Sequence, residues 1–274
     1  MSSINDKSAL VSVIMPTYNH ARYIGEAIES VLNQTYKNFE LIIIDNYSTD
    51  NTAEIVASYN DKRIKYLKFR NHGIIAASRN HGIKNSNGKY IAFLDSDDIW
   101  LPQKLELQIE LMESNKDIGM SYVLYSHLLE DGSVKGVFPK LGHRLRGDVF
   151  TSLYRKSVIA NSGTVVRMEV FKELGLLDEN PKLVTIEDYE MWLRIAKSRP
   201  IDYVDHKIQL LYRIRCDNSS NMMKSFTKWQ REMLLTNKYA HTVGKLYYVS
   251  VVCSKTIHLI YDSIIPIGNQ PDLF

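Results

Sequence analysis

The chain of 274 residues carries a net charge of +3, is 45% hydrophobic and 24% charged, and has a mean hydropathy of −0.23. This composition excludes a disordered chain, a collagen-like repeat and a coiled coil, and the length allows one large core or two modest ones. Its two cysteines, Cys216 and Cys253, cannot build a disulfide framework. Because no long apolar run and no leader-like start occur, we expect a reduced, cytoplasmic setting.

The charge is unevenly distributed. Basic and acidic side chains balance over residues 1–220, so the excess lies in residues 221–274. A pI near 8.6 without a dense basic cluster does not indicate nucleic-acid binding. The basic tail favours peripheral contact with an anionic membrane, at the inner face of the cell membrane, with a solvated basic helix as the alternative.

Short apolar runs alternate with helix-period stretches over the first hundred residues. The predicted strands cover residues 11–15, 39–44, 64–69 and 90–94, and the predicted helices cover 24–33, 52–58 and 75–85. Continuous apolar runs separated by helices are typical of parallel strands that are buried on both faces. We therefore expect an α/β fold with a Rossmann-like, mostly parallel sheet flanked by helices.

The second half of the sequence is more mixed. In chain order, we predict a helix over 102–114, a strand over 118–129, a hairpin turn at Asp131-Gly132, a helix over 149–156, a strand over 163–167, and helices over 169–174 and 187–197. Thr185 is the predicted cap of the last of these helices. Residues 217–221 predict a mobile loop, and a helical C-terminal appendage follows from about residue 225.

Polar residues follow three of the predicted strands. They are Pro16-Thr17-Tyr18-Asn19, Asp45-Asn46 and Asp95-Ser96-Asp97-Asp98. The carboxyl ends of parallel strands lie along one edge of a sheet, where α/β proteins bind their ligands. We therefore expect these three segments to converge on one site.

The carboxylates after the fourth strand predict a cation. Carboxylates clustered beside a buried strand are costly unless positive charge compensates them, and Mg²⁺ typically takes one or two carboxylates plus substrate phosphates. Asp95 and Asp97 could reach one ion, or one could bind a ribose hydroxyl. The alternative is a solvated loop in which Asp98 or a neighbour caps the next helix. No glycine-rich dinucleotide fingerprint occurs, which disfavours a dehydrogenase.

Six segments, in order along residues 10–200, resemble family 2 glycosyltransferases. They are VSVIMPTYN (11–19), FELIIID (39–45), STD (48–50), SRN (78–80), GKYIAFLDSDD (88–98) and EDYEMWLR (187–194). The resemblance implies a GT-A fold, a nucleotide-sugar donor, a divalent metal such as Mn²⁺ or Mg²⁺, and inverting transfer of a sugar.

The resemblance also implies roles for single residues at the donor site. Pro16, Thr17 and Tyr18 fall where the family holds the nucleotide, and Asp45-Asn46 where it reads the base. The family usually has two acidic residues at this strand end, and this sequence has Asn46 in the second place. Asn46 can donate as well as accept a hydrogen bond, so UDP is favoured while the preference for a base stays open.

The metal and catalytic roles follow in the same way. Asp97 would be the main metal contact and Asp95 a metal or ribose contact, with Ser96 between them in the donor site. Arg79 would face a phosphate or pair with an acid. Asp188 falls where the family has the base that takes the proton of the acceptor hydroxyl. Its position in the first turn of a helix favours the ionised form, although acids are also common there for structural reasons.

Two later features have a structural alternative. Arg213 and Arg215 alternate along a predicted strand, so they share a face and would meet the diphosphate or form ion pairs. Aromatic residues of the tail, with its lysines, are compatible with an interfacial helix or with packing onto the domain. They are Trp229, Tyr239, Tyr247 and Tyr248.

These observations predict a GT-A domain over residues 1–220 and a helical tail over 221–274. Within the domain, the nucleotide-sugar half covers about 10–100 and the acceptor half about 101–220. The function is predicted as transfer from a nucleotide sugar to a saccharide or polyprenyl-linked saccharide in polysaccharide biosynthesis. The alternatives are a sugar-phosphate nucleotidyltransferase, and a non-catalytic partner subunit that binds nucleotide sugars.

Overall fold

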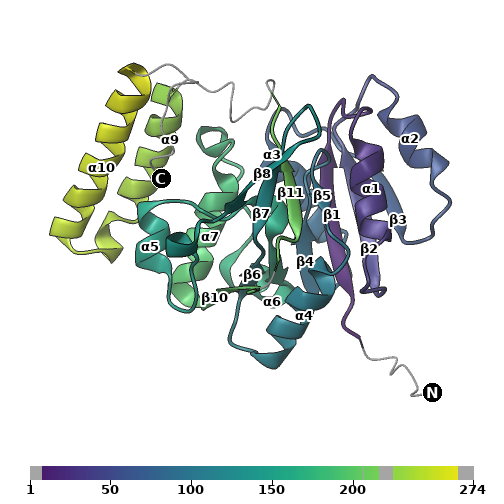
Figure 1. Cartoon of the computed structure of the whole chain (residues 1–274), viewed down its shortest axis with the longest axis horizontal. Coiled ribbons are helices and arrows are strands. Elements are labelled where there is room, and N and C mark those ends of the chain that lie inside the picture. The colour runs from purple at the N-terminus through teal and green to yellow at the C-terminus, as the bar shows by residue number, and fades with distance from the viewer. Residues whose placement is uncertain (1–7, 206, 216–224, 265–274) are drawn as a thin grey trace.

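The structure, a computed structural model, describes residues 8–205, 207–215 and 225–264 (Figure 1). Its centre is a seven-stranded sheet of order β10-β6-β9-β4-β1-β2-β3. β9 runs antiparallel to β4 and β6, and the other neighbours pair in parallel, as the sequence predicts. The strands are β1 (Val11–Thr17), β2 (Phe39–Asp45), β3 (Ile64–Lys68), β4 (Tyr90–Phe93), β6 (Met120–Tyr122), β9 (Val165–Arg167) and β10 (Ile201–Tyr203).

Helices cover both faces of the parallel half of the sheet. They are α1 (Ile24–Leu32), α2 (Thr52–Ser58) and α3 (Ile75–Lys84), each within a residue of its predicted bounds. Along β1, Val13 and Met15 pack in the cluster that includes α1, and Ile14 packs on the face of α3. A Cβ atom on Gly82 of α3 would lie 2.6 Å from Cγ2 of Ile14. Glycine therefore lets α3 lie close against the sheet.

The strand predicted over residues 118–129 is wrong as a single element, because it forms two strands in different sheets. β6 belongs to the main sheet, and β7 belongs to a four-stranded sheet of order β5-β11-β7-β8. The chain changes sheet at Val123 and Leu124, which are both buried, so the apolar pattern continues across the junction. The strands of the small sheet are β5 (Ile99–Trp100), β7 (Tyr125–Leu128), β8 (Val134–Phe138) and β11 (Leu210–Arg213).

The turn predicted at Asp131-Gly132 is confirmed. β7 and β8 pair in antiparallel fashion across it, and Gly132 has a φ of +80°, which glycine adopts without strain.

The helices of the second half are confirmed within two residues of their predicted bounds. They are α4 (Lys104–Ser114), α5 (Phe150–Arg155), α6 (Met168–Leu174) and α7 (Glu187–Ser198). Among the described residues, 3₁₀ turns lie at Leu141–His143, Asn161–Gly163 and Pro181–Leu183, and in the tail at Ala240–Thr242. The predicted cap at Thr185 is wrong: the residue before α7 is Ile186, which makes no side-chain cap, and Thr185 has a φ of 75°.

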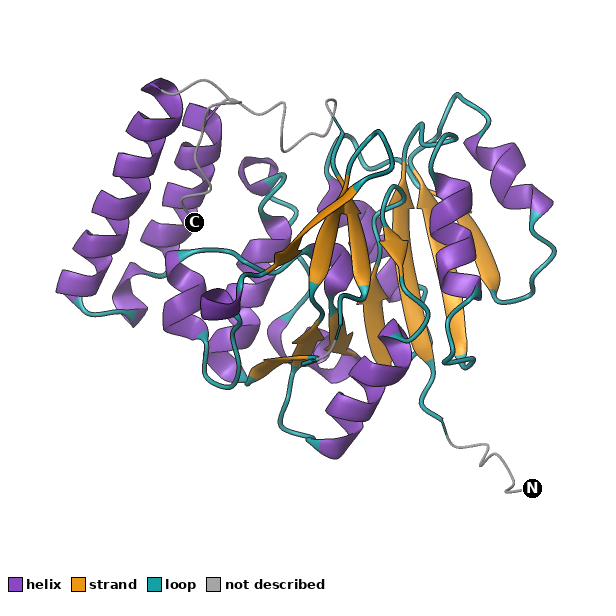
Figure 2. Ribbon diagram, viewed as in Figure 1, coloured by secondary structure: helices purple, strands orange, loops and turns teal. Residues whose placement is uncertain are grey.

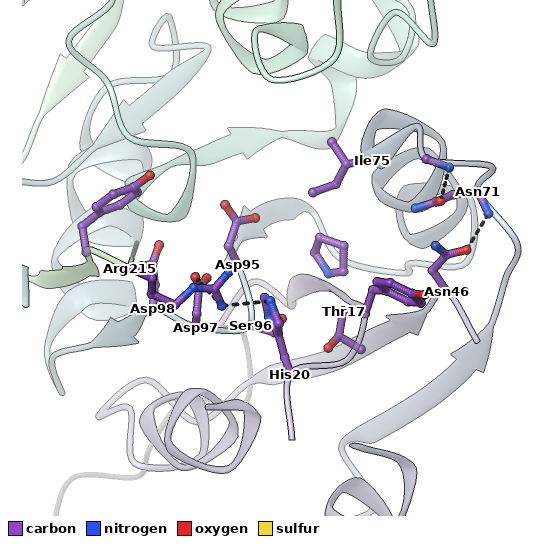
Figure 3. Close-up of a pocket in the computed structure, with 14 residues that line it drawn as sticks. Thr17, His20, Asn46, Asn71, Ile75, Asp95, Ser96, Asp97, Asp98 and Arg215 are labelled. Carbon is purple, nitrogen blue, oxygen red and sulfur yellow. Dashed lines mark hydrogen bonds and ion pairs between the residues drawn. The ribbon is translucent and has the colours of Figure 1, made fainter. Parts of the chain in front are cut away.

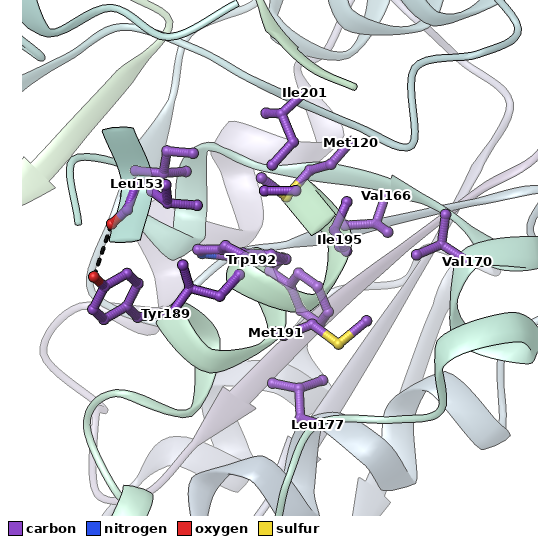
Figure 4. Packing of buried hydrophobic residues seen from close by; sticks show 14 of the residues in the cluster. Met120, Leu153, Val166, Val170, Leu177, Tyr189, Met191, Trp192, Ile195 and Ile201 are labelled. Carbon is purple, nitrogen blue, oxygen red and sulfur yellow. Dashed lines mark hydrogen bonds between the residues drawn. The ribbon is translucent and has the colours of Figure 1, made fainter. Parts of the chain in front are cut away.

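α7 is the central helix of the second half. Its apolar side chains Met191, Trp192 and Ile195 are completely buried, as the helical spacing predicts. They share one cluster with Met120 of β6 and Val166 of β9 (Figure 4). The helix is thus fixed firmly against the sheet, which matters because its first turn carries Glu187 and Asp188.

The predicted helical tail is confirmed. α9 (Ser225–Lys238) and α10 (Lys245–Ile264) lie side by side against α5 and α7 (Figure 2). Tyr239 and Tyr247 donate hydrogen bonds to the domain, so these two aromatics pack onto it. Within the described residues, none of the helices combines the length and the apolar character needed to cross a membrane. The predicted loop over 217–221 and the domain boundary near 220 lie outside the described residues.

Candidate active site

A cavity of about 330 Å³ opens where β1, β2 and β4 end, which confirms that the three polar segments converge (Figure 3). The predicted site residues that line it are Pro16, Thr17, Tyr18, Asn46, Asp95, Ser96 and Asp97. Asp45, Arg79 and Asp188 lie outside this lining. The sequence analysis missed other lining residues, which are His20, Asn71, Gly73, Ile75 and Tyr212.

Asp45 is held by the protein itself. Its Oδ1 atom accepts hydrogen bonds from the backbone N–H and the hydroxyl of Ser48, at 2.9 and 2.6 Å, and Oδ2 accepts from the hydroxyl of Tyr66. The carboxylate is buried. Asp45 therefore shapes the loop after β2 from behind the cavity wall.

Asn46 is the residue of this pair that faces the cavity. Its Oδ1 atom accepts a hydrogen bond from the backbone N–H of Asn71 at 3.0 Å. Only the oxygen of an amide can accept a hydrogen bond from an N–H group. This contact therefore identifies which end of the Asn46 amide is the oxygen and which is the NH₂ donor. A donor at this place suits a carbonyl oxygen on a nucleotide base.

The carboxylates after β4 are compensated by arginines and by hydrogen bonds. Asp97 Oδ2 lies 3.2 Å from Nη1 of Arg215, and Asp95 Oδ1 lies 2.8 Å from Nη2 of Arg79. Burial, together with the charge of Asp95, raises the pKa of Asp97 to about 6, while Arg215 opposes this shift. A further cation beside Asp97 would favour the ionised form of its carboxyl.

Asp98 has a structural role that differs from the helix cap considered as the alternative. It is buried, and its carboxylate accepts hydrogen bonds from the hydroxyl of Ser162 at 2.5 Å and from the backbone N–H of Arg213 at 2.8 Å. Burial, followed by the charges of Asp97 and Asp95, raises its pKa well above the usual range. Asp98 therefore ties the loop after β4 to β11.

The described residues contain no group of three or more His, Cys, Asp or Glu side chains that could hold a metal by themselves. The donor set nevertheless fits a divalent cation that arrives with a diphosphate, because such ions need only one or two protein carboxylates in that case. Asp97 and Asp95 both line the cavity and would supply these oxygen ligands.

Arg79 forms ion pairs with two carboxylates. Of the two roles expected for this residue, contact with a phosphate or pairing with an acid, the structure shows the second. The side chain is buried, with Nη1 2.5 Å from Oε1 of Glu187 and Nη2 2.8 Å from Asp95. Those carboxylates raise its pKa further, against the effect of burial. Arg79 thus connects the end of β4 to the first turn of α7.

Asp188 is half-buried beside this ion pair. Its Oδ1 atom accepts a hydrogen bond from the backbone N–H of Tyr189 at 2.7 Å. Burial, followed by the charge of Glu187, raises the pKa of Asp188 to about 7, while Arg79 opposes the shift. The expectation that the first turn favours the ionised form is therefore wrong, because desolvation outweighs the helix terminus. The result is a carboxyl that changes protonation state near neutral pH.

Arg213 and Arg215 share one face, as their alternation predicts, since both guanidinium groups stack on the ring of Tyr23. Arg213 donates to the backbone oxygen of Asp97 and pairs with Glu26. Arg215 also lies 2.9 Å from Nε2 of His20, whose Nδ1 atom lies 2.7 Å from the hydroxyl of Ser96. Both arginines therefore brace the loop after β4.

Comparison with known proteins identifies this arrangement. The profile described as Glycosyl transferase family 2 matches residues 12–175, and the chain belongs to this family. It is 38% identical over 231 residues to an uncharacterized glycosyltransferase of Rickettsia conorii, an alignment that covers 84% of this chain and 36% of that protein. The chain thus spans little more than a third of the length of this relative.

Two further comparisons concern a named enzyme and a solved structure. The chain is 34% identical over 241 residues to the UDP-Glc:alpha-D-GlcNAc-diphosphoundecaprenol beta-1,3-glucosyltransferase WfgD of Escherichia coli, which covers 88% of this chain and 90% of WfgD. The structure of the present chain is similar to that of S. aureus TarS in complex with UDP-GlcNAc. The TM-score is 0.69 at 19% identity, and the match covers 90% of this chain and 71% of the TarS chain. The fold is therefore the GT-A fold.

Proposed function

We propose that the protein is an inverting glycosyltransferase that moves a sugar from a nucleoside-diphosphate sugar, with UDP favoured, to a hydroxyl of a saccharide or lipid-linked saccharide in polysaccharide biosynthesis. The observation that carries the proposal is the link between two sites. The cavity carboxylates Asp95 and Asp97 are joined through Arg79 and Glu187 to the turn that presents Asp188. The names of WfgD and the TarS complex support a UDP-sugar donor, and WfgD supports a lipid-linked acceptor.

In the donor half, the cavity residues would bind and orient the nucleotide sugar. The amide of Asn46 would donate to a carbonyl oxygen of the base, and Asp97 and Asp95 would hold Mn²⁺ or Mg²⁺ against the diphosphate. When bound, the cation supplies positive charge that stabilises the leaving nucleoside diphosphate. No acid is then needed on the leaving side.

In the acceptor half, Asp188 would act as the general base. Its carboxylate takes the proton of the acceptor hydroxyl while that oxygen attacks the anomeric carbon from the side opposite the leaving diphosphate, so the configuration inverts. A pKa of about 7 suits this task, because general bases work best when their pKa lies near the operating pH. Glu187 is held by Arg79, which leaves Asp188 for the proton transfer.

The donor site is tested by thermal stability of the purified chain against UDP, GDP, dTDP and CDP, each with and without Mn²⁺. A nucleotide at about 100 times its dissociation constant stabilises by roughly 2.7 kcal/mol, which a melting curve resolves. We expect one uracil or thymine nucleotide to stabilise with metal, and Asp97→Asn to abolish the gain. Asp117→Asn, an exposed acid after α4, is the matched control. Equal curves for all nucleotides would contradict the donor site.

The enzyme is separated from a non-catalytic binding subunit by Asp188→Asn. We expect this variant to keep the stabilisation by nucleotide and metal and to lose sugar transfer to lipid-linked saccharides. Chromatography of the reaction products measures the transfer. Transfer at the wild-type rate would refute the assignment of the base, and binding without transfer by the wild type across donors and acceptors would favour the binding subunit.

We further propose that the tail contacts the membrane surface peripherally. Leu246 and Ile257 of α10 are 89% and 65% exposed, although they are large apolar residues. Apolar side chains on a helix with lysines are favourable at an anionic interface. We expect co-sedimentation with anionic vesicles that falls with added salt and in the Leu246→Ser/Ile257→Ser variant. Equal recovery of variant and wild type would contradict this contact.

A further inference from the structure

The helices of the tail surround the first half of α7, which carries Asp188. Lys238, the last residue of α9, and Tyr239, which follows it, both approach Oε1 of Glu190 at 2.8 Å. Lys255 of α10 lies over the ring of Tyr189, 5.7 Å from its centroid. These contacts flank Asp188 on its C-terminal side, where α7 is already packed in the core. They show that the tail is built onto the helix of the proposed base.

On the other side of Asp188, Arg231 of α9 forms hydrogen bonds to the segment that leads into α7. Arg231 donates through Nη1 to the backbone oxygen of Val184 and, at 3.2 Å, to the hydroxyl of Thr185. The guanidinium group therefore holds two of the three residues that join the 3₁₀ turn Pro181–Leu183 to α7.

The segment that Arg231 holds is strained. Thr185 has a φ of 75°, in the left-handed region that β-branched residues rarely adopt. Such a conformation costs on the order of 1–3 kcal/mol and persists only where the surroundings enforce it. Only Ile186 and Glu187 separate this position from Asp188, so relaxation of the strained turn would change the direction in which the first turn of α7 presents its side chains.

We propose that Arg231 is a positioning residue for the general base: by holding the strained turn at Thr185, it fixes the orientation of Asp188 toward the acceptor hydroxyl. The inference rests on the proposed function. It also gives the tail a role in the reaction, because the residue comes from α9, outside the part of the chain that the family profile matches.

Arg231 would act through the backbone and not through its charge. Besides burial, the pKa of Asp188 is affected most by Glu187 and Arg79, followed by the hydrogen bond from the backbone of Tyr189 and the charge of Asp95. Removal of Arg231 should therefore lower kcat and leave both the KM for the donor and the pH at half-maximal rate unchanged. A positional error on the order of 1 Å can cost about 100-fold in rate, so we expect a loss of about 10- to 100-fold in kcat.

The test compares Arg231→Met and Arg231→Lys with Lys228→Met, which removes an exposed cation from the same helix. We expect Arg231→Met to lose kcat, Arg231→Lys to recover part of it, and Lys228→Met to behave as wild type. Hydrogen exchange gives a second readout that needs no activity: the amides of Ile186 and Glu190 should exchange faster in Arg231→Met.

A double-mutant cycle separates strain from simple contact. Thr185→Gly relieves the left-handed strain, whereas Thr185→Ala keeps the Cβ atom that causes it and removes the hydroxyl together with the γ-methyl group. If Arg231 holds the strained turn, Arg231→Met should cost much less kcat in the Thr185→Gly background and almost its full cost in the Thr185→Ala background. Additive effects in both backgrounds would overturn the proposal.

The outcomes also separate this inference from the proposed function. Faster exchange at residues 184–190 with unchanged kcat in Arg231→Met would overturn the positioning role while leaving the glycosyltransferase proposal intact. Unchanged exchange in Arg231→Met would overturn the inference without any activity measurement. A wild type that binds nucleotide but transfers no sugar would refute the proposed function, and the positioning role would fall with it.

Discussion

The replacement Asp188→Asn should remove activity and at the same time stabilise the protein. A carboxyl with a pKa of about 7 in the folded protein and about 3.9 in the unfolded chain costs the folded state at most about 4 kcal/mol at pH 8. Because Asp188 is half-buried and coupled to Glu187 and Arg79, we expect about 1–4 kcal/mol. Asparagine removes this cost, since its amide carries no charge and its oxygen can still accept from the backbone of Tyr189.

The sign of the effect depends on pH. Between about pH 4 and pH 7 the folded protein binds more protons at Asp188 than the unfolded chain does, so this residue makes the wild type lose stability as the pH rises through that window. Urea unfolding of wild type and Asp188→Asn at pH 8, 6 and 4 measures the difference directly. The advantage of the variant should be largest at pH 8 and vanish near pH 4. A variant that is less stable than the wild type at pH 8, or a difference that does not vary with pH, would refute the reasoning.

Three further outcomes are expected. The transfer rate should rise about tenfold between pH 6 and pH 8 and level off above, because the ionised fraction of a base with a pKa of about 7 rises in that way; a rate independent of pH would count against Asp188. Arg79→Met should destabilise by about 3–5 kcal/mol in urea unfolding, since it leaves two carboxylates without their cation, and should cost less in a Glu187→Gln background. Gly82→Ala should destabilise by about 1–3 kcal/mol by forcing α3 away from Ile14, and an unchanged unfolding midpoint would contradict that contact.

The parallel half of the fold could be predicted from the sequence because its signals are local. Strands buried on both faces are continuous apolar runs, and the helices between them have their own period. The same rule failed at Val123 and Leu124, where two short strands of different sheets are joined by buried apolar residues. Hydropathy does not record a change of sheet, since both sides of the junction are equally apolar.

Only those residues of the candidate site that lie at the ends of strands could be predicted from the sequence. The order of a parallel sheet brings the segments after β1, β2 and β4 together, so the lining from Thr17, Asn46 and Asp97 follows from the sequence. The hydrogen bond from Tyr66 to Asp45 and the strained turn at Thr185 do not follow, because each depends on a partner distant in the chain. For His20, the one local signal is its place just after the first polar segment.

The site also shows why its assembly depends on the complete fold. Asp95 and Asp97 are negative charges at the end of a buried strand, and the arginines beside them come from distant segments: Arg79 from α3, and Arg215 after β11. A local error in either segment leaves a carboxylate uncompensated, which disfavours the compact state. Arg79 adds a second condition, because its other partner is Glu187. Arg79 thus links Asp95 to the turn that presents Asp188, so under the proposed function a variant that damages these ion pairs should affect donor binding and proton transfer at once.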